Sequence, residues 1–222
     1  MSRRVRVKIC GVGDAREVAL AAASGADAIG FVSGWKTPEG RLDDAQIEAL
    51  MRQVPSGPSK VLLTPYLSPE AMIAHAVRCG ADTLQICDHV PVAYRYEVRA
   101  ALPEVRLLQV AHMGGAIEVS EVVGLAEGAD GLLLDSGVSG ASFSERGGTG
   151  RVHDWEKSRA VVASVNTPVW LAGGLTPNNV LEAVSTVRPY GVDVCSGLRD
   201  QGVLSRRLVR QFMDALKTSA GG

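Results

Sequence analysis

Short apolar runs alternate with amphipathic segments along almost the whole chain, and this alternation restricts the possible folds more than any other feature of the sequence. The apolar runs have the length of buried strands, and the segments between them have the length and pattern of helices. Strands that alternate with helices predict a parallel sheet with right-handed crossovers. The predicted strands are Val5–Cys10, Ala28–Val32, Lys60–Thr64, Thr83–Ile86, Arg106–Ala111, Gly131–Asp135, Val169–Ala172 and Val192–Cys195. The predicted helices are Asp14–Ser24, Asp43–Val54, Pro69–Cys79, Val92–Ala101, Ala116–Ala126, Asp154–Ser164, Pro177–Val187 and Leu204–Lys217.

The number of strand–helix units favours an α/β fold of one type, a single (β/α)8 TIM barrel that spans residues 1–222 as one domain. An open doubly wound sheet is the alternative that the same alternation allows. No Pro/Ser-rich linker or charge block divides the chain. The tripeptide Gly-Ala-Asp precedes three of the predicted strands, at Gly25–Asp27, Gly80–Asp82 and Gly128–Asp130, which indicates that one structural unit recurs.

The composition of the chain limits which binding partners we expect. The net charge is -1, which argues against nucleic acid and against an anionic membrane surface. No apolar stretch reaches the ~18 residues that a membrane span needs, and no secretory signal opens the chain, so we expect a cytoplasmic protein. The four cysteines lack CxxC spacing, and no histidine lies at zinc-ligand spacing from two of them, so we expect neither a metal site nor a disulfide framework.

In a barrel, the reactive groups lie at the carboxyl ends of the strands. Cys10 ends the first predicted strand and is followed by Gly11, which turns the backbone out of it. Taken alone, such a thiol is more often a small core residue than a reactive group. Asp135 ends a very apolar strand, where partial desolvation would raise its pKa toward that of a general acid. It could instead cap the loop that follows. We expect Cys10 and Asp135 to face a substrate from two sides of the barrel mouth.

Two glycine-bearing turns follow the last two predicted strands. The first contains Gly173 and Gly174, and the second contains Ser196 and Gly197. Glycine lets the backbone approach an anion and point N–H groups at it, and these two loops are the usual phosphate site of a barrel. Each glycine could also serve only as a tight turn. The long loop 137–151, which includes Gly148, has the length and composition of a lid over a sugar.

These residues together resemble the phosphoribosylanthranilate isomerase family of tryptophan biosynthesis. The resemblance implies a (β/α)8 barrel that performs an Amadori rearrangement on a phosphorylated ribose without cofactor or metal. It implies that Asp135 is the general acid and that Cys10, as a thiolate, is the general base. It implies further substrate contacts from Arg41, Gln85, Gly148, Gly173, Gly174, Ser196 and Gly197. The motifs that carry it are Lys8–Gly11, Gly25–Phe31, Leu133–Ser136, Gly147–Gly150, Asp154–Trp155, Ala172–Leu175, Asn178–Val180, Val192–Val194 and Ser196–Gly197.

The chain departs from the family pattern where anthranilate would bind. Glu39 stands in the place of the family's usual arginine, and Arg41 follows two residues later. Cys87 stands where the family tends to have a histidine; His89 and His112 could substitute for it. Two alternatives therefore stay open: a diverged paralogue that acts on another aminated ribose phosphate, and a phosphate-binding barrel without catalysis. Either a monomer or a homodimer fits the composition.

Overall fold

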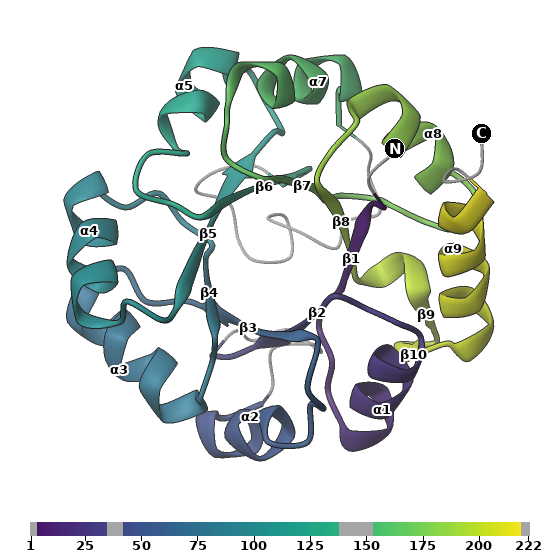
Figure 1. The fold of residues 1–222 in the computed structure, drawn as a ribbon, viewed down its shortest axis with the longest axis horizontal. Helices are drawn as coiled ribbons and strands as arrows, with labels where there is room; N and C mark the ends of the chain where they lie inside the picture. Colours follow the sequence, from purple (N-terminus) through teal and green to yellow (C-terminus); the bar gives the residue numbers. More distant parts are fainter. Residues whose placement is uncertain (1–3, 35–41, 138–152, 219–222) are drawn as a thin grey trace.

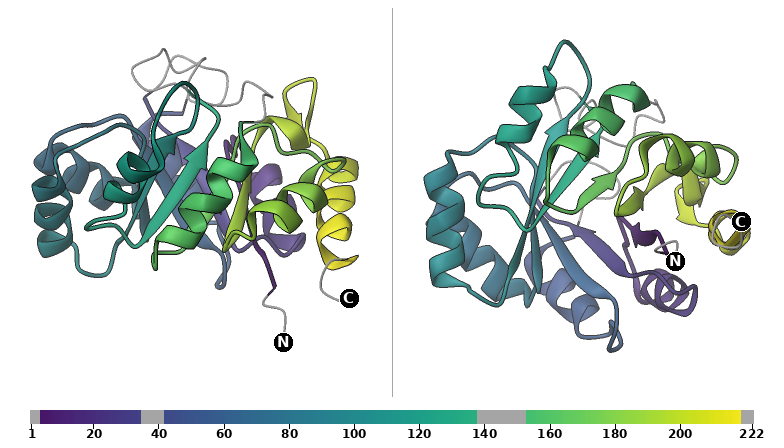
Figure 2. Two further views of the ribbon diagram at one scale, coloured as in Figure 1. Left: turned by 90° about the horizontal axis from the view of Figure 1, so that it is seen from above. Right: turned by 45° about the horizontal axis from the view of Figure 1, so that its top comes forward.

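Eight parallel strands close into a barrel in the computed structural model, which describes residues 4–34, 42–137 and 153–218 (Figure 1). The strands follow one another around the ring in sequence order, and the helices lie outside it (Figure 2). This confirms the (β/α)8 barrel and excludes the doubly wound sheet. The barrel strands are β1 (Arg6–Ile9), β2 (Ala28–Val32), β3 (Ser59–Thr64), β4 (Thr83–Ile86), β5 (Arg106–His112), β6 (Gly131–Asp135), β7 (Val169–Leu171) and β8 (Gly191–Val194). The α-helices are α1 (Ala15–Ala23), α2 (Asp44–Met51), α3 (Pro69–Cys79), α4 (Val92–Ala101), α5 (Val119–Gly124), α7 (Trp155–Ser164), α8 (Val180–Val187) and α9 (Arg206–Thr218).

The recurring Gly-Ala-Asp tripeptide has one structural role at all three places. Each aspartate precedes an even-numbered strand and accepts a hydrogen bond from a backbone N–H of the preceding strand. Asp27 accepts from Val7 at 2.9 Å, and Asp130 accepts from Leu107 at 2.8 Å. Asp82 accepts from Lys60 at 3.0 Å. The tripeptide therefore ties neighbouring strands together at the amino-terminal end of the barrel.

The end of the chain differs from the sequence-based expectation in two places. Helix α8 begins at Val180 and not at Pro177, because Asn179 holds the preceding turn: its side chain accepts from the Thr176 N–H at 2.8 Å and donates to the Gly174 carbonyl at 2.9 Å. A short 3-10 helix, η1 (Ser196–Leu198), and a small antiparallel hairpin, β9 (Arg199–Asp200) with β10 (Val203–Leu204), follow β8 and were not predicted.

Buried hydrophobic side chains form two separate layers. The larger one, called the outer layer here, combines strand residues such as Ile29, Phe31 and Leu132 with helix residues such as Ile47 and Met72, so it lies between the barrel and its helices. The smaller one, called the inner layer, contains residues from strands and strand ends alone and fills the barrel. The inner-layer hydrophobic residues are Cys10, Ala28, Val32, Val61, Leu63, Cys87, Leu108, Val110, Leu133 and Ala172.

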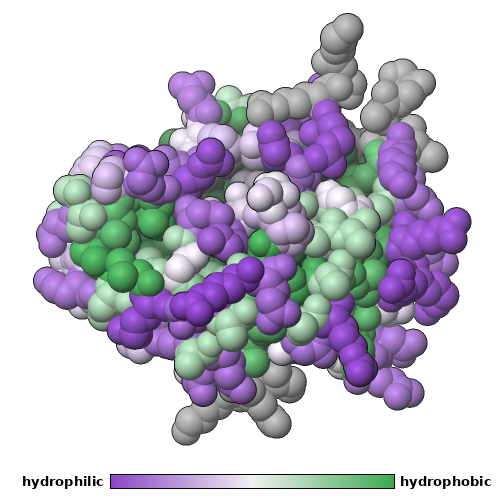
Figure 3. All heavy atoms as spheres, turned by 60° about the horizontal axis from the view of Figure 1, so that its bottom comes forward, coloured by the Kyte–Doolittle hydropathy of each residue, from purple (hydrophilic) through white to green (hydrophobic). Residues whose placement is uncertain are grey.

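The surface carries scattered hydrophobic residues. On the face shown in Figure 3, hydrophobic areas lie between hydrophilic side chains. Isolated exposed apolar residues are normal for a folded domain and do not by themselves mark an interface. Within the described ranges, no helix combines the length and the hydropathy needed to cross a membrane. The large hydrophobic side chains that are exposed are Tyr66, Leu67, Val77, Tyr96, Leu181 and Val203.

Candidate active site

Cys10 lies immediately after β1, buried inside the barrel with 7% of its surface exposed. Its N–H donates to the Val194 carbonyl of β8 at 2.9 Å, which continues the pairing of the two strands. Gly30 on β2 makes room for the thiol, because a Cβ atom there would lie 2.8 Å from Cys10 Sγ. Burial raises the pKa of the Cys10 thiol well above its ordinary value, and nearby Lys8 opposes that rise.

Lys8 and Asp193 form a buried ion pair inside the barrel, and the sequence reasoning did not identify either as a site residue. They are register partners on β1 and β8, and Lys8 Nζ lies 2.8 Å from Asp193 Oδ2. Lys8 is fully buried, and Asp193 is 8% exposed. The signal was present in the strand period: Lys8 is two residues before Cys10 and shares its face of the strand.

Asp135, the last residue of β6, is 9% exposed. In the ring, β7 and β8 separate β6 from β1, so Asp135 and Cys10 reach the mouth from non-neighbouring strands. Burial, helped by the negative charge of Asp193, raises the pKa of Asp135 to about 7. Backbone hydrogen bonds from Gly137 and Ser136 oppose the rise. Asp135 can therefore hold a proton near neutral pH, as a general acid must.

The two predicted phosphate turns lie against each other. A Cβ atom on Gly197, in η1, would come within 1.9 Å of the Leu175 carbonyl oxygen, so the second turn packs directly on the first. Gly173 and Gly174 both have positive φ, at 86° and 64°. Gly173 also packs on Ser136, which follows Asp135. The glycines thus join the turns after β7 and β8 to the end of β6, as a shared anion site beside the acid would need.

Of the remaining predicted substrate contacts, the structure describes Gln85 but not Arg41 or Gly148. Gln85 on β4 is buried, and its Oε1 has no hydrogen-bond partner within the described part of the chain; the same is true of Asp193 Oδ1. Both acceptors are available for substrate hydroxyl or amine groups. His112 donates through Nε2 to the Cys87 carbonyl at 2.8 Å, so that nitrogen is already used. The predicted contacts Arg41 and Gly148, and the departure at Glu39, lie outside the described residues.

A second buried ion pair supports the loop behind Cys10. Arg199 Nη1 lies 2.8 Å from Glu17 Oε1, and both side chains are 9% exposed. Arg199 also donates to the Gly11 carbonyl, and the Gly13 N–H donates to Glu17 at 2.9 Å. The segment from Gly11 to Gly13 is therefore fixed to the hairpin that follows the second phosphate turn.

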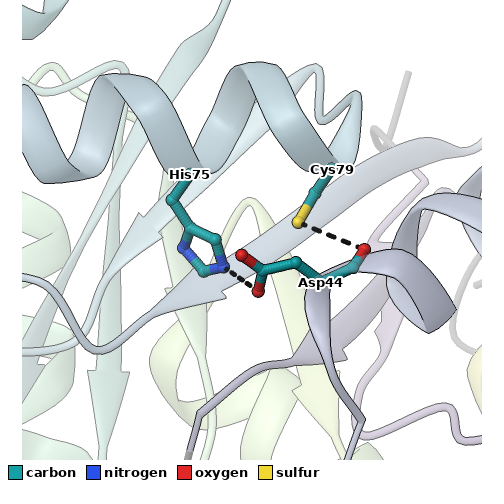
Figure 4. A group of neighbouring side chains, drawn as sticks. All are labelled: Asp44, His75 and Cys79. Carbon is teal, nitrogen blue, oxygen red and sulfur yellow. Dashed lines mark hydrogen bonds and ion pairs between the residues drawn. The ribbon is translucent and has the colours of Figure 1, made fainter.

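Asp44, His75 and Cys79 are the described residues that could hold a metal ion, since their potential ligand atoms lie within 4.8 Å of one another (Figure 4). They lie between α2 and α3, outside the barrel. Their polar atoms have protein partners: His75 Nε2 is 3.2 Å from Asp44, His75 Nδ1 is 3.0 Å from Thr64 Oγ1, and Cys79 Sγ donates to the Asp44 carbonyl. Arg78 Nη2 neutralises Asp44 at 2.8 Å. The cluster is thus complete as a hydrogen-bond network that joins the two helices.

A closed (β/α)8 barrel with a protonatable carboxylate and a thiol at the carboxyl ends of its strands, and a buried lysine inside it, defines an enzyme of the proton-transfer class. Comparisons with known proteins identify the family. The family model described as "N-(5'phosphoribosyl)anthranilate (PRA) isomerase" matches residues 7–215. The chain belongs to this family, and so to the isomerases of tryptophan biosynthesis.

Individual relatives agree with the family assignment over the full length of the chain. The N-(5'-phosphoribosyl)anthranilate isomerase of Methanocella arvoryzae is 32% identical over 96% of this chain and 99% of its own length. The enzyme of Haloferax volcanii is 37% identical over 97% of this chain and 95% of its own. The crystal structure of phosphoribosyl anthranilate isomerase from Thermus thermophilus has a TM-score of 0.81 at 25% identity and covers 97% of this chain and 100% of its own.

Proposed function

We propose that this chain isomerises N-(5'-phosphoribosyl)anthranilate to 1-(2-carboxyphenylamino)-1-deoxyribulose 5-phosphate, with Asp135 as general acid and Cys10 as general base. The observation that carries the proposal is the state of Asp135, a buried carboxylate whose pKa is raised to about 7 at the carboxyl end of β6. An acid for sugar-ring opening must carry its proton at neutral pH, and an ordinary exposed aspartate does not.

The reaction follows from these two groups. Asp135 donates its proton to the ring oxygen of the ribose as the C1–O bond breaks, and the nitrogen lone pair forms an iminium at C1. Cys10, as a thiolate, removes the C2 proton, and the C2–H electron pair neutralises the iminium to an enolamine. Tautomerisation of the enolamine gives the C2 ketone. The two groups act in succession on adjacent parts of one substrate, which suits their positions on separate strands of one mouth.

The phosphate would bind at the turns that contain Gly173, Gly174, Ser196 and Gly197. The close packing of Gly197 on Leu175 and the positive φ at Gly173 and Gly174 support this assignment, because both need residues without a side chain. Gln85 Oε1 and Asp193 Oδ1 are buried acceptors suited to the hydroxyl or amine groups of the substrate. We include Arg41 and Gly148 as substrate contacts because of their positions in the sequence.

The test is product identification from purified protein. Incubation with N-(5'-phosphoribosyl)anthranilate and chromatographic separation of the isomers should show the deoxyribulose product, and Cys10→Ala should form it far more slowly. Folded protein that makes no product would contradict the proposal. A second aminated ribose phosphate in the same assay tests the diverged paralogue, which the Cys87 and Glu39 departures favour; turnover of that compound alone would select it. Binding of both compounds without turnover would select the non-catalytic barrel.

The composition of this chain fits two oligomeric states. We expect a monomer or a homodimer. A solved relative from Thermotoga maritima is described as monomers generated from a dimeric phosphoribosylanthranilate isomerase, which shows that protein in both states. Sedimentation velocity decides between the two states for this chain.

A further inference from the structure

Lys8 is the most unusual buried group in the barrel. It is a lysine with no exposed surface, in the middle of β1, and its side chain faces the inner layer. Lysine is almost never fully buried unless it is paired. Its partner is Asp193, on the neighbouring strand β8, with Nζ and Oδ2 2.8 Å apart. A buried ion pair of this kind is often no more stabilising than apolar residues of the same size, so stability alone does not account for it.

We propose that Lys8, held in place by Asp193, is a positioning residue that supports the ionised form of the Cys10 thiol. The inference rests on the proposed function, in which Cys10 must be a thiolate to remove the C2 proton. Lys8 stays protonated throughout; it neither gives nor takes a proton in the reaction.

The geometry places the Lys8 side chain beside the thiol. A Cβ atom on Gly30 would lie 2.8 Å from Cys10 Sγ and 3.2 Å from Lys8 Cε, so the two side chains share the small space left by that glycine. The positive charge of Lys8 lowers the pKa of the Cys10 thiol and so opposes the effect of burial. A cation close to a thiol favours the thiolate over the neutral form.

The other charged groups around the thiol oppose its ionisation. Asp193 in β8 and Cys195, which follows β8, each disfavour a negative charge on Cys10. Lys8 also lowers the pKa of Asp135, at the end of β6, and of Cys87, which follows β4. Burial removes the water that would otherwise stabilise the thiolate. Lys8 is therefore the cation in this set, and it is the group whose loss should change Cys10 most.

The experiment measures the ionisation of Cys10 without substrate. The rate of alkylation by iodoacetamide is followed against pH, with peptide mass mapping to separate Cys10 from the other cysteines, in wild type and in Lys8→Met, Lys8→Arg and Lys8→Met/Asp193→Asn. We expect the midpoint of Cys10 alkylation to rise by about one pH unit or more in Lys8→Met. The double variant should fall between Lys8→Met and wild type, because it also removes an opposing negative charge. Lys8→Arg should stay near wild type.

The double variant keeps the test decisive where Lys8→Met alone fails to fold, since it leaves no buried unpaired charge. Cys79, which lies outside the barrel, is the internal control, and its alkylation should not change between variants. A Cys10 midpoint in the folded double variant equal to or below that of wild type would overturn the role of Lys8. Failure of the wild-type protein to turn over the substrate would instead overturn the proposed function, since alkylation does not depend on turnover.

A kinetic readout separates positioning from general stability. With substrate at neutral pH, Lys8→Met/Asp193→Asn should have at least tenfold lower kcat than the single variant Asp193→Asn, and Lys8→Arg should retain most of the wild-type kcat. Loss of Lys8 that leaves kcat unchanged in a folded variant would contradict the proposal.

Discussion

The outer and inner layers of this barrel are both buried, but they are built from different chemistry. The outer layer, between strands and helices, is mainly hydrophobic, with fully buried residues such as Phe31 and Leu132, and the buried polar side chains beside it, such as His75 and Arg95, have hydrogen-bond partners. The inner layer is smaller, and beside its hydrophobic residues the barrel holds Lys8, Asp135 and Asp193. Hydrophobic burial stabilises a fold, whereas burial of ionisable groups is costly. The difference indicates that the outer layer holds the barrel together and that the ionisable groups inside the barrel are maintained for chemistry.

The largest expected effect is on turnover, from the inner layer. Cys10→Ala removes the proposed base and should lower kcat about a thousandfold, within the usual range for acid–base groups. Cys79→Ala is the matched control, because Cys79 is also buried but belongs to the outer layer. It should leave kcat unchanged. Steady-state kinetics with phosphoribosylanthranilate measures both, and equal losses from the two variants would remove the distinction between the layers.

Two adjacent leucines of β6 allow the outer and inner layers to be compared within one strand. Leu132 belongs to the outer layer and Leu133 to the inner layer, and both are buried. Truncation of either to alanine should cost roughly 2–5 kcal/mol in the free energy of unfolding, because each leaves a cavity. Leu133→Ala should also lower kcat, since Leu133 lies two residues before Asp135 on the same face of the strand. Denaturant unfolding and kinetics on the same preparations check this; a kcat loss confined to Leu132→Ala would contradict it.

Asp135 should make the protein less stable as pH rises. Its pKa is about 7 in the folded protein and about 3.9 in an unfolded chain. Below about pH 4 both the folded and the unfolded state hold the proton. Between about pH 4 and 7 only the folded state holds it, so the free energy of unfolding falls as the pH rises through this range. The stabilisation is fully lost once Asp135 ionises in the folded protein, above pH 7. Asp135→Asn cannot ionise, so at pH 8 it should exceed wild type by on the order of 4 kcal/mol in the free energy of unfolding. The difference should vanish near pH 4, and a constant difference at all pH values would refute the assignment.

The smallest expected effect concerns the phosphate turns. Gly197→Ala forces a Cβ atom against the Leu175 carbonyl and should move the two turns apart. We expect KM for the substrate to rise about tenfold, which corresponds to roughly 1.4 kcal/mol of binding. Gly124→Ala is the control, because Gly124 lies in α5 with open space around it. An unchanged KM in Gly197→Ala would argue that this glycine serves only the turn.

The same contrast explains what the sequence could predict. Outer-layer residues repeat with the periods of strands and helices, so β2, β4 and β6, and helices α3 and α4, have the predicted bounds. Asp135 was predictable because an acidic residue at the end of the run Gly131–Asp135 is conspicuous. These signals are local in the chain.

The parts that could not be predicted depend on contacts between distant residues. The strand period places Lys8 on the same face as Cys10, but the charged partner that its burial requires, Asp193, is 185 positions away. The late start of α8 depends on the Asn179 side chain, which is used to hold the preceding turn. Asp44 joins His75 and Cys79 only once α2 packs on α3. Closure of the ring sets the first of these pairings and helix packing the last, and neither leaves a periodic pattern in the sequence.

The most direct test of the account is a paired measurement on Asp135→Asn: turnover of phosphoribosylanthranilate and the free energy of unfolding, both at pH 8 on one preparation. The account predicts a loss of turnover of about a thousandfold together with a stability equal to or above that of wild type. Retained turnover, or a loss of stability like that of Leu132→Ala, would contradict the claim that Asp135 is kept in the barrel for catalysis at the expense of the fold.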